Sequence, residues 1–212
     1  MKMFAANRSG VQKKGRQIFA ANRSGVQKKG RKLCPVACLV GNGACFNKGR
    51  ATNMNENDIK QGYVYHIKNS YFDLAKDDKL MRNHEGGAYR PTYYCLKDEK
   101  TGLLWVIPMS SRVEKYTVHM QKDIERYGKC LKILVARYGD GESAFLFQNM
   151  FPILPKYINH IHTVAGSPMQ VNPAVQKIIT SRFKEVLRLY RRGIKMVFPD
   201  IIRLEKLMLE ES

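Results

Sequence analysis

Apolar positions beyond residue 60 recur at the spacing of short β-strands. A first run covers 62–67, and two longer runs, 89–96 and 103–109, flank a polar segment at 98–102 that contains a glycine. Apolar runs of this length joined by a short turn are typical of antiparallel hairpins. The pattern therefore predicts three strands, of which the second and third pair with each other.

The middle of the chain predicts one helix and a second hairpin. The helix spans 118–127, where Val118, Ile124 and Tyr127 are expected to face the core. The hairpin joins 130–138 to 143–148 through a four-residue turn, whose Gly and Asp residues suit positive φ angles.

The last third of the sequence predicts two helices. Asn172 can cap the first, Pro173 fits its first turn and Gly193 can end it, while Asp200 can cap the second. The expected inward faces are Val175, Ile178, Ile179, Phe183, Val186, Leu187 and Tyr190 in one helix, and Ile201, Leu204, Leu207 and Met208 in the other. The predicted fold is α+β, a compact antiparallel sheet or barrel with packed helices, two of them C-terminal.

The charge distribution divides the chain near residue 53. The formal net charge is +19, and residues 1–53 hold 12 of the 37 Lys and Arg residues but none of the 18 acidic ones. Residues 54–212 suffice for one domain and are still basic enough to attract an anionic polymer. Since no apolar run approaches the roughly 20 residues of a membrane span, we expect a soluble, cytoplasmic protein in which Cys95 and Cys130 are buried free thiols.

Residues 2–33 contain a tandem repeat of 15 residues. Its two copies, KMFAANRSGVQKKGR and QIFAANRSGVQKKGR, agree at 13 positions, and the letters KL begin a third. Two copies and a fragment are too few for a stacked repeat fold, and each copy has little apolar surface to bury. The near-identity indicates duplicated DNA, so we expect translation of the native protein to begin at Met54. The alternative is a basic, disordered arm that binds nucleic acid.

Candidate phosphate-binding groups gather near the ends of the predicted strands. The groups that follow the third strand are Ser110, Ser111, Arg112 and Lys115. The groups that precede or enter the second strand are His84, Tyr89 and Arg90, and the first strand runs into His66, Lys68 and Tyr71. Pairing of the second and third strands would bring Arg90 and Ser110 to the same end of the sheet.

With these segments in this order, the chain resembles the ToxN/AbiQ-type toxins of type III toxin–antitoxin systems, most closely the CptN-like branch. The resemblance covers about 63–209 and rests on YHIKNSYFDL, GAYRPTYYCLKD, GLLWVIPMSS, ILVARYGDGESAFLFQNMFP and the C-terminal helices. It implies an endoribonuclease with a small barrel-like sheet related to the MazF type. It also implies an antitoxin RNA of short tandem repeats, encoded directly upstream of the toxin gene, and so explains residues 2–33 as repeat DNA read in frame.

The resemblance also implies the site and the partners. Catalytic roles fall on Tyr71, Arg90, Ser110 and Ser111, and we expect RNA contacts from Lys68, His66, His84, Tyr89, Arg112 and Lys115. The Pro-Lys that follows the Thr-Ser pair of relatives is not reproduced, so Arg112 or Lys115 must supply that cation. The implied partners are a repeat-derived antitoxin RNA in a closed toxin–RNA assembly, and cellular and phage RNA as substrate, with a role in growth arrest or abortive infection.

The implied reaction needs neither a metal nor another cofactor. The ribose 2′-OH attacks the adjacent phosphorus, leaving a 2′,3′-cyclic phosphate and a 5′-OH, while cations and hydroxyls stabilise the charge on the phosphate oxygens. DNA lacks the attacking group, so the expected substrate is RNA and not DNA. A noncatalytic, basic RNA-binding regulator is the alternative function.

Histidines and tyrosines offer competing interpretations. His160 and His162 would share one face of an extended segment, as a metal pair or an acid–base pair would, but no carboxylate or third His is close in sequence, so a structural role is favoured. The tyrosines that interleave with Lys and Arg, of which we expect one or two to contact RNA, are Tyr89, Tyr93, Tyr94, Tyr116, Tyr127 and Tyr138.

Overall fold

The computed structural model describes residues 56–85 and 87–212, so the predicted leader at 1–53 lies outside the described residues. The helices are α1 (Asn69–Ala75), α2 (Val113–Tyr127), α3 (Pro173–Arg191) and α4 (Ile201–Glu210), with 3₁₀ turns η1 (Glu56–Asp58), η2 (Phe147–Asn149) and η3 (Pro155–Tyr157). The strands of the main sheet are β1 (Val64–Ile67), β4 (Thr92–Lys97), β5 (Leu104–Ser110), β6 (Ile133–Tyr138), β7 (Gly141–Leu146), β8 (Phe151–Ile153) and β9 (Ile158–Ile161). Two small ribbons pair β2 (His84–Glu85) with β3 (Ala88–Tyr89), and β10 (Thr163–Val164) with β11 (Ser167–Pro168).

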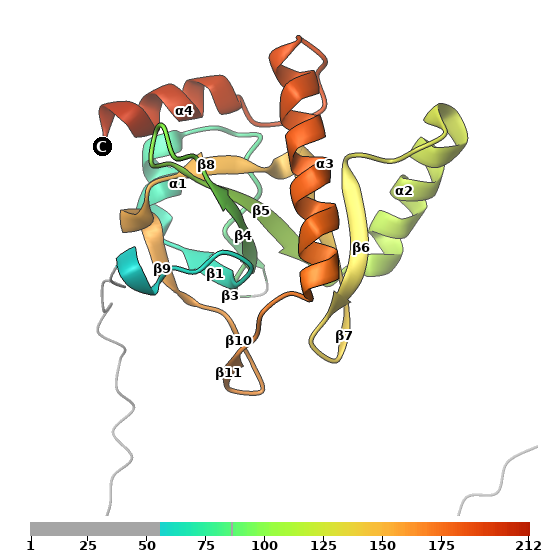
Figure 1. Ribbon diagram of the computed structural model, residues 1–212, viewed down its shortest axis with the longest axis horizontal. Helices are drawn as coiled ribbons and strands as arrows, with labels where there is room; N and C mark the ends of the chain where they lie inside the picture. Colours follow the sequence, from blue (N-terminus) through green and yellow to red (C-terminus); the bar gives the residue numbers. More distant parts are fainter. Residues whose placement is uncertain (1–55, 86) are drawn as a thin grey trace, which may run out of the picture. The chain divides into compact units, whose positions relative to one another are not determined.

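The main sheet is antiparallel and follows the order β6-β7-β5-β4-β1-β9, with β8 also paired to β5 (Figure 1). Both predicted hairpins are present: β4 pairs with β5, and β6 with β7. Gly139 lies in the turn of the second hairpin at a φ of 64°, which favours glycine. Among the described strands, β6 and β9 end the path without pairing with each other, so the α+β fold is an open sheet rather than a closed barrel.

Helices cover both faces of the sheet centre (Figure 1). On one face, Trp105 of β5 packs against Phe183 of α3 with ring centroids 5.3 Å apart. On the other face, Leu104 and Val106 belong to a cluster with residues of α1 and α4. Because successive side chains of a strand point to opposite faces, a sheet covered on both faces needs continuous apolar strands. All seven residues of β5 are accordingly buried.

The C-terminal helices form with the predicted caps. The side chain of Asn172 accepts a hydrogen bond from the backbone N–H of Ala174, and that of Asp200 accepts one from Arg203. Gly193 follows α3 with a φ of 86°. One inward prediction is wrong, because Ile178 is 49% exposed.

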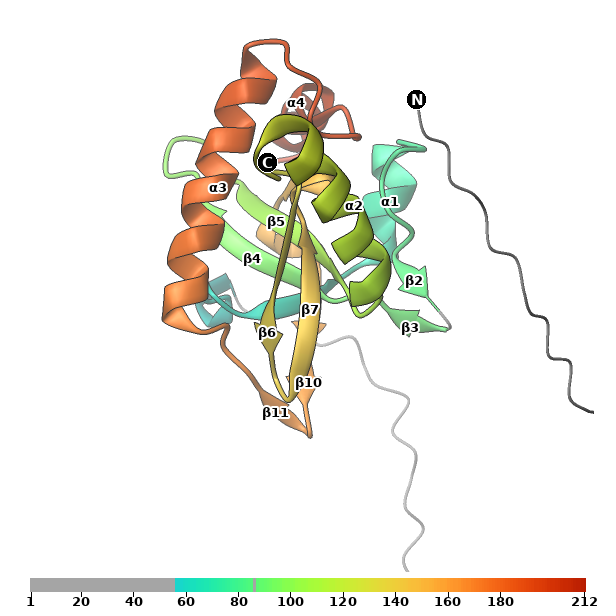
Figure 2. The same cartoon turned by 90° about the vertical axis from the view of Figure 1, so that its right-hand side faces the viewer.

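Helix α2 differs from its prediction in the residues that it packs against the rest of the domain. Val118, Ile124 and Tyr127 are exposed, whereas Tyr116 and Met120 pack against the small cluster of the β6–β7 hairpin. Tyr116 precedes Val118 by two residues, or about 200° of rotation, so Val118 points away from the side of the helix that contacts the hairpin. Figure 2 shows α2 beside β6 and β7, and Figure 1 shows it to the side of the sheet centre.

Two elements near the N-terminal strand were not predicted. Helix α1 starts directly after β1, and β9 pairs with β1 so that His66 lies opposite His160. Cys95 and Cys130 are buried free thiols, as predicted. None of the helices described is both long and apolar enough to cross a membrane.

Candidate functional site

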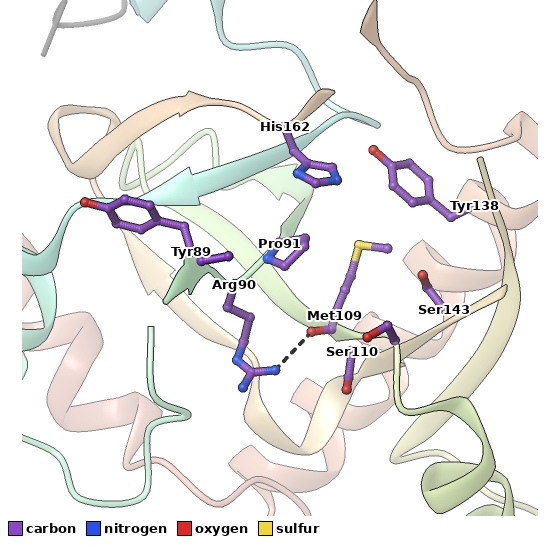
Figure 3. Close-up of a pocket in the computed structure, with 10 residues that line it drawn as sticks. Tyr89, Arg90, Pro91, Met109, Ser110, Tyr138, Ser143 and His162 are labelled. Atoms are coloured by element: carbon purple, nitrogen blue, oxygen red, sulfur yellow. Dashed lines mark hydrogen bonds between the residues drawn. The ribbon is translucent and has the colours of Figure 1, made fainter. Parts of the chain in front are cut away.

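A cavity of about 390 Å³ opens where β3 and the residues before β4 meet the end of β5, the β6–β7 hairpin and the segment that follows β9 (Figure 3). It is lined by Ala88, Tyr89, Arg90, Pro91, Met109, Ser110, Ser111, Tyr138, Ser143 and His162. The polar groups of this pocket thus come from strand ends and loops on a rigid sheet, a common arrangement in binding and catalytic sites.

Arg90 connects the β2–β3 ribbon to β4 and is held by backbone carbonyls. Its Nε donates to the carbonyl of Arg82 at 3.0 Å, and its Nη1 donates to that of Met109 at 3.3 Å. Its own backbone N–H donates to the carbonyl of Asn83. These contacts fix the guanidinium beside the end of β5, where a phosphate oxygen could accept its hydrogen bonds.

Ser110 and Ser111 join β5 to α2. Ser110 is the last residue of β5, pairs with Ala144 of β7 and is 5% exposed. Its Oγ accepts a hydrogen bond from the backbone N–H of Arg112 at 3.3 Å, whereas Ser111 is exposed. Helix α2 then begins at Val113 without a side-chain cap. The positive end of its dipole therefore lies next to the serine pair, which favours an anion there.

Three histidines, His66, His160 and His162, form a cluster on the other side of the pocket. The ring centroid of His66 is 4.6 Å from that of His160 and 5.0 Å from that of His162. The Nε2 of His66 lies 3.0 Å from the Nδ1 of His162, and one of these two nitrogens carries the shared proton. We call these three residues the histidine cluster.

Two tyrosines connect the histidine cluster to the pocket lining. The Tyr89 ring lies 5.8 Å from His66 and 4.3 Å from His84, and the Tyr138 ring lies 6.1 Å from His162. His84 is exposed, and its Nε2 lies 2.8 Å from the Oδ1 of Asn69. Burial raises the pKa of Tyr138 to about 12, so its phenol keeps its proton at neutral pH.

Burial also sets the charge state of the histidine cluster. It lowers the pKa of His66 to about 4, with the charges of His160 and His162 as further causes. The pKa of His160 is lowered by burial, and that of His162 by burial and then by the charge of His160. The cluster is therefore predominantly neutral at pH 7 and can accept protons.

Tyr71 does not line the pocket. Helix α1 turns its side chain into the core, where it is 0% exposed and its hydroxyl donates to the carbonyl of Pro152 at 3.0 Å. Burial raises its pKa well above the ordinary value, which opposes proton transfer at neutral pH. The structure therefore places Tyr71 in the core, apart from the other three residues predicted to be catalytic.

The other predicted residues divide between the pocket and its surroundings. Tyr89, Arg90, Ser110 and Ser111 lie together, His66 and His84 contact Tyr89, and Arg112 follows the serine pair. Lys68 and Lys115 do not line the pocket: the Nζ of Lys68 donates to the carbonyl of Lys156, and Lys115 lies along α2 beside the Tyr116 ring.

Sequence reasoning missed part of the lining. Met109 and Pro91 lie in the same predicted hairpin as Arg90 and Ser110. Tyr138 and Ser143 come from the second hairpin and His162 from the segment after β9, so tertiary folding brings them to the pocket. The signal for His162 was its spacing of two from His160, which places both near one edge of the sheet. Of the tyrosines considered for RNA stacking, Tyr93 and Tyr94 are core residues, whereas Tyr89 and Tyr138 line the pocket.

The pocket combines a fixed guanidinium, serine and tyrosine hydroxyls, a helix N-terminus and a neutral imidazole. Such groups can bind a phosphodiester, stabilise negative charge on its oxygens and accept a proton. Among the described residues, no group of three or more His, Cys, Asp or Glu side chains could hold a metal ion.

Comparison with known proteins assigns the fold. No family model matches the sequence, and no curated protein is similar to it in sequence. Among solved structures, the lactococcal anti-phage endoribonuclease AbiQ, of a type III toxin–antitoxin system, matches with a TM-score of 0.54 and 16% identity over 72% of this chain and 99% of that one. A structure from a bacterial antiviral system regulated by a processed non-coding RNA matches with a TM-score of 0.54 and 14% identity over 71% and 98%.

A third structure, from bacterial type III systems in which a non-coding RNA pseudoknot selectively inhibits the toxin, matches with a TM-score of 0.50 and 18% identity over 72% and 98% of the two chains. The described domain therefore corresponds to nearly the whole of each of these proteins. The chain has their fold, as the resemblance in its sequence implied.

Proposed function

We propose that this chain is the endoribonuclease toxin of a type III toxin–antitoxin system. The observation that carries the proposal is the pocket of Arg90, Ser110 and Ser111, built beside the N-terminus of α2. The shared fold with an anti-phage endoribonuclease supports it. The charge of residues 54–212 is a second support, because their 25 Lys and Arg residues outnumber the 18 acidic ones by 7 and favour association with a polyanion.

In the proposed reaction, the ribose 2′-OH attacks the neighbouring phosphorus in line with the departing 5′-oxygen. Arg90 stabilises the negative charge that grows on the non-bridging oxygens, and Ser111 donates a hydrogen bond to the same phosphate. The buried Ser110 fixes the turn that presents Ser111, since its Oγ accepts the N–H of Arg112. The products are a 2′,3′-cyclic phosphate and a 5′-OH.

The nucleophile of this reaction belongs to the substrate. No water has to be activated for the first step, so the proposed mechanism needs no metal ion, and only RNA can supply the attacking hydroxyl. Positioning of the phosphate and stabilisation of its charge provide most of the rate acceleration.

The proposed inhibitor is a repeat-derived antitoxin RNA that the toxin cuts from its precursor and binds in a closed assembly. Two related structures come from systems with a regulatory non-coding RNA or an inhibitory RNA pseudoknot. The 15-residue repeat at 2–33 supports the same partner, because it fits repeat DNA upstream of the toxin read in frame from a start before Met54. Release of the toxin would then cut cellular and phage RNA in the cytoplasm and arrest growth.

The test is RNA cleavage by the purified chain in EDTA. We expect fragments that end in 2′,3′-cyclic phosphate and 5′-OH, and no cleavage of DNA of the same sequence. The matched control is the Arg90→Ala variant purified in parallel, which guards against a contaminating ribonuclease. Intact RNA that stays bound, with an affinity that falls steeply with salt, would instead favour a noncatalytic RNA-binding regulator.

A further inference from the structure

The histidine cluster borders the pocket in which the proposed reaction takes place. His66 and His160 are directly opposite each other on β1 and β9, and His162 follows β9 by one residue, with its backbone N–H donating to the carbonyl of Val64 at 2.8 Å. Backbone pairing thus fixes all three positions. Of the three side chains, that of His162 lines the pocket together with Arg90 and Ser110.

The contact between His66 and His162 determines which nitrogen of His162 is available. The Nδ1 of His162 faces the Nε2 of His66 at 3.0 Å, so its Nε2 lies on the other edge of the ring. Figure 3 shows this imidazole beside Tyr138 and above Pro91, both of which line the pocket with it. When the Nδ1 of His162 carries the proton and donates it to His66, its Nε2 holds a lone pair.

The surroundings favour the neutral form of His162. Burial and the charge of His160 lower the pKa of His162. The other ionisable groups that face the cluster are the phenols of Tyr89 and Tyr138, the imidazole of His84 and the cationic Arg90. None of these groups is an anion at neutral pH. A positive charge on the cluster is therefore disfavoured until the substrate phosphate brings a negative one.

We propose that His162 is the general base that removes the proton from the attacking ribose 2′-OH, and that His66 is a positioning residue that holds its Nε2 toward the pocket. This inference rests on the proposed function. The 2′-oxygen forms the new bond to phosphorus while its proton moves to the Nε2 of His162. The bond from phosphorus to the 5′-oxygen breaks, and that oxygen takes a proton from water. The imidazolium then returns its proton to water.

His162 thus takes the proton-transfer role that the sequence had suggested for Tyr71. An unperturbed hydroxyl is a weak base at pH 7, and the Tyr71 phenol is buried away from the pocket. A neutral imidazole is a better base at this pH and typically contributes about 10²- to 10⁴-fold. Arg90 remains the group that stabilises charge, so the two residues have different roles.

The first test compares His162→Gln with wild-type protein in single-turnover cleavage of an end-labelled pool of random-sequence RNAs. Glutamine keeps a polar side chain but cannot act as a base. We expect cleavage to fall by about 100-fold or more with RNA binding unchanged, and free imidazole to restore part of the loss in a His162→Ala variant. His119→Ala, which removes an exposed histidine on α2, serves as the control and should stay within about twofold of wild type.

The second test uses the pH profile, which a purely structural role would not change. Because the base must be neutral, wild-type cleavage should rise with pH along a limb centred below the ordinary histidine pKa of about 6.5. His160→Gln removes a charge that lowers the pKa of His162, so the limb should move to higher pH. His66→Ala should lower the maximal rate, and His66→Gln, whose amide can still bond to the Nδ1 of His162, should restore part of it.

The outcomes separate this inference from the function on which it rests. Wild-type protein that leaves RNA intact would contradict the proposed function itself. Wild-type protein that cleaves, combined with an active His162→Gln variant or a flat wild-type profile between pH 5 and 7, would overturn the role of His162 and leave the endoribonuclease standing. Thermal unfolding of each variant identifies any that fails to fold, and the wild-type profile decides the matter without a variant.

Discussion

The two sides of the pocket offer different kinds of polar group. One side, the serine–arginine side, consists of Arg90, Ser110 and Ser111 at the ends of β4 and β5. The other side is the histidine cluster, which has His66 on β1, His160 on β9 and His162 directly after β9. Burial keeps these imidazoles predominantly neutral. One side therefore supplies positive charge and hydroxyl groups, and the other supplies proton acceptors. In the proposed mechanism, charge stabilisation and proton transfer therefore belong to separate parts of the sheet.

Removal of the guanidinium should give the largest effect on the serine–arginine side. We expect Arg90→Ala to lower single-turnover RNA cleavage by about 100-fold or more, as loss of a hydrogen-bond donor to a developing oxyanion does. Arg90→Lys should recover only part of the activity, because a lysine cannot reproduce the guanidinium fork. Arg192→Ala removes the same charge from an exposed position after α3 and should have little effect.

Loss of activity in Arg90→Ala supports a role in cleavage only if the variant keeps its fold, because Arg90 also donates to two backbone carbonyls. Circular dichroism and the melting temperature provide that check. A folded Arg90→Ala variant with wild-type cleavage would remove the serine–arginine side from the mechanism.

Acid should destabilise the fold through the histidine cluster. The pKa of His66 is about 4 in the folded protein, against about 6.5 in an unfolded chain. Between these values the unfolded chain binds a proton that the folded protein does not, so the free energy of unfolding falls as the pH falls from 6.5 to 4. The contribution of His66 is about 3 kcal/mol at most.

Urea unfolding at pH 7 and pH 4.5 measures this loss. In His66→Gln, which cannot be protonated in this range, the loss between the two pH values should be smaller than in wild-type protein. An equal loss in both proteins would show that His66 is not the source of the acid sensitivity, and would break the contrast between a charged and a neutral side of the pocket.

The exposed serine should have a smaller effect on cleavage. We expect Ser111→Ala to lower the rate by about tenfold, roughly the value of one hydrogen bond to a charged group. Ser181→Ala, at an exposed position on α3, is the matched control and should leave the rate unchanged. Wild-type activity in Ser111→Ala would leave Arg90 and the backbone as the phosphate-binding groups of this side.

The same contrast explains how much the sequence could reveal. The serine–arginine side comes from one hairpin, β4 and β5, whose apolar runs and turn are visible locally, so the meeting of Arg90 with Ser110 could be predicted. The histidine cluster depends on pairing between His66 and His160, which are far apart in the chain. No local pattern encodes such a pairing. The spacing of two between His160 and His162 predicts only that their side chains point to the same side of an extended segment.

The helices show a similar limit. The caps of α3 and α4 are local chemistry, and both helices form as predicted. Helix α2 packs on the β6–β7 hairpin and not on the sheet centre, and its apolar residues Val118 and Ile124 remain exposed. Which face of an amphipathic helix is buried is decided by its tertiary neighbour, and the sequence does not identify that neighbour.

The smallest expected effect concerns Tyr71, whose misplacement has a local cause. If the chain had continued past β1 as a loop, Tyr71 could have reached the pocket, but α1 begins at Asn69 and places Tyr71 and Ala75 one turn apart on the buried face. Tyr71→Phe should keep the stacking with Phe151 and lose the hydrogen bond to Pro152, at a cost of about 1 kcal/mol in the free energy of unfolding. Cleavage should change less than twofold, as expected for a group that takes no part in proton transfer. Thermal unfolding and single-turnover cleavage measure the two effects, and a large loss of cleavage at unchanged stability would return the proton-transfer role to Tyr71 and take it away from the histidine cluster.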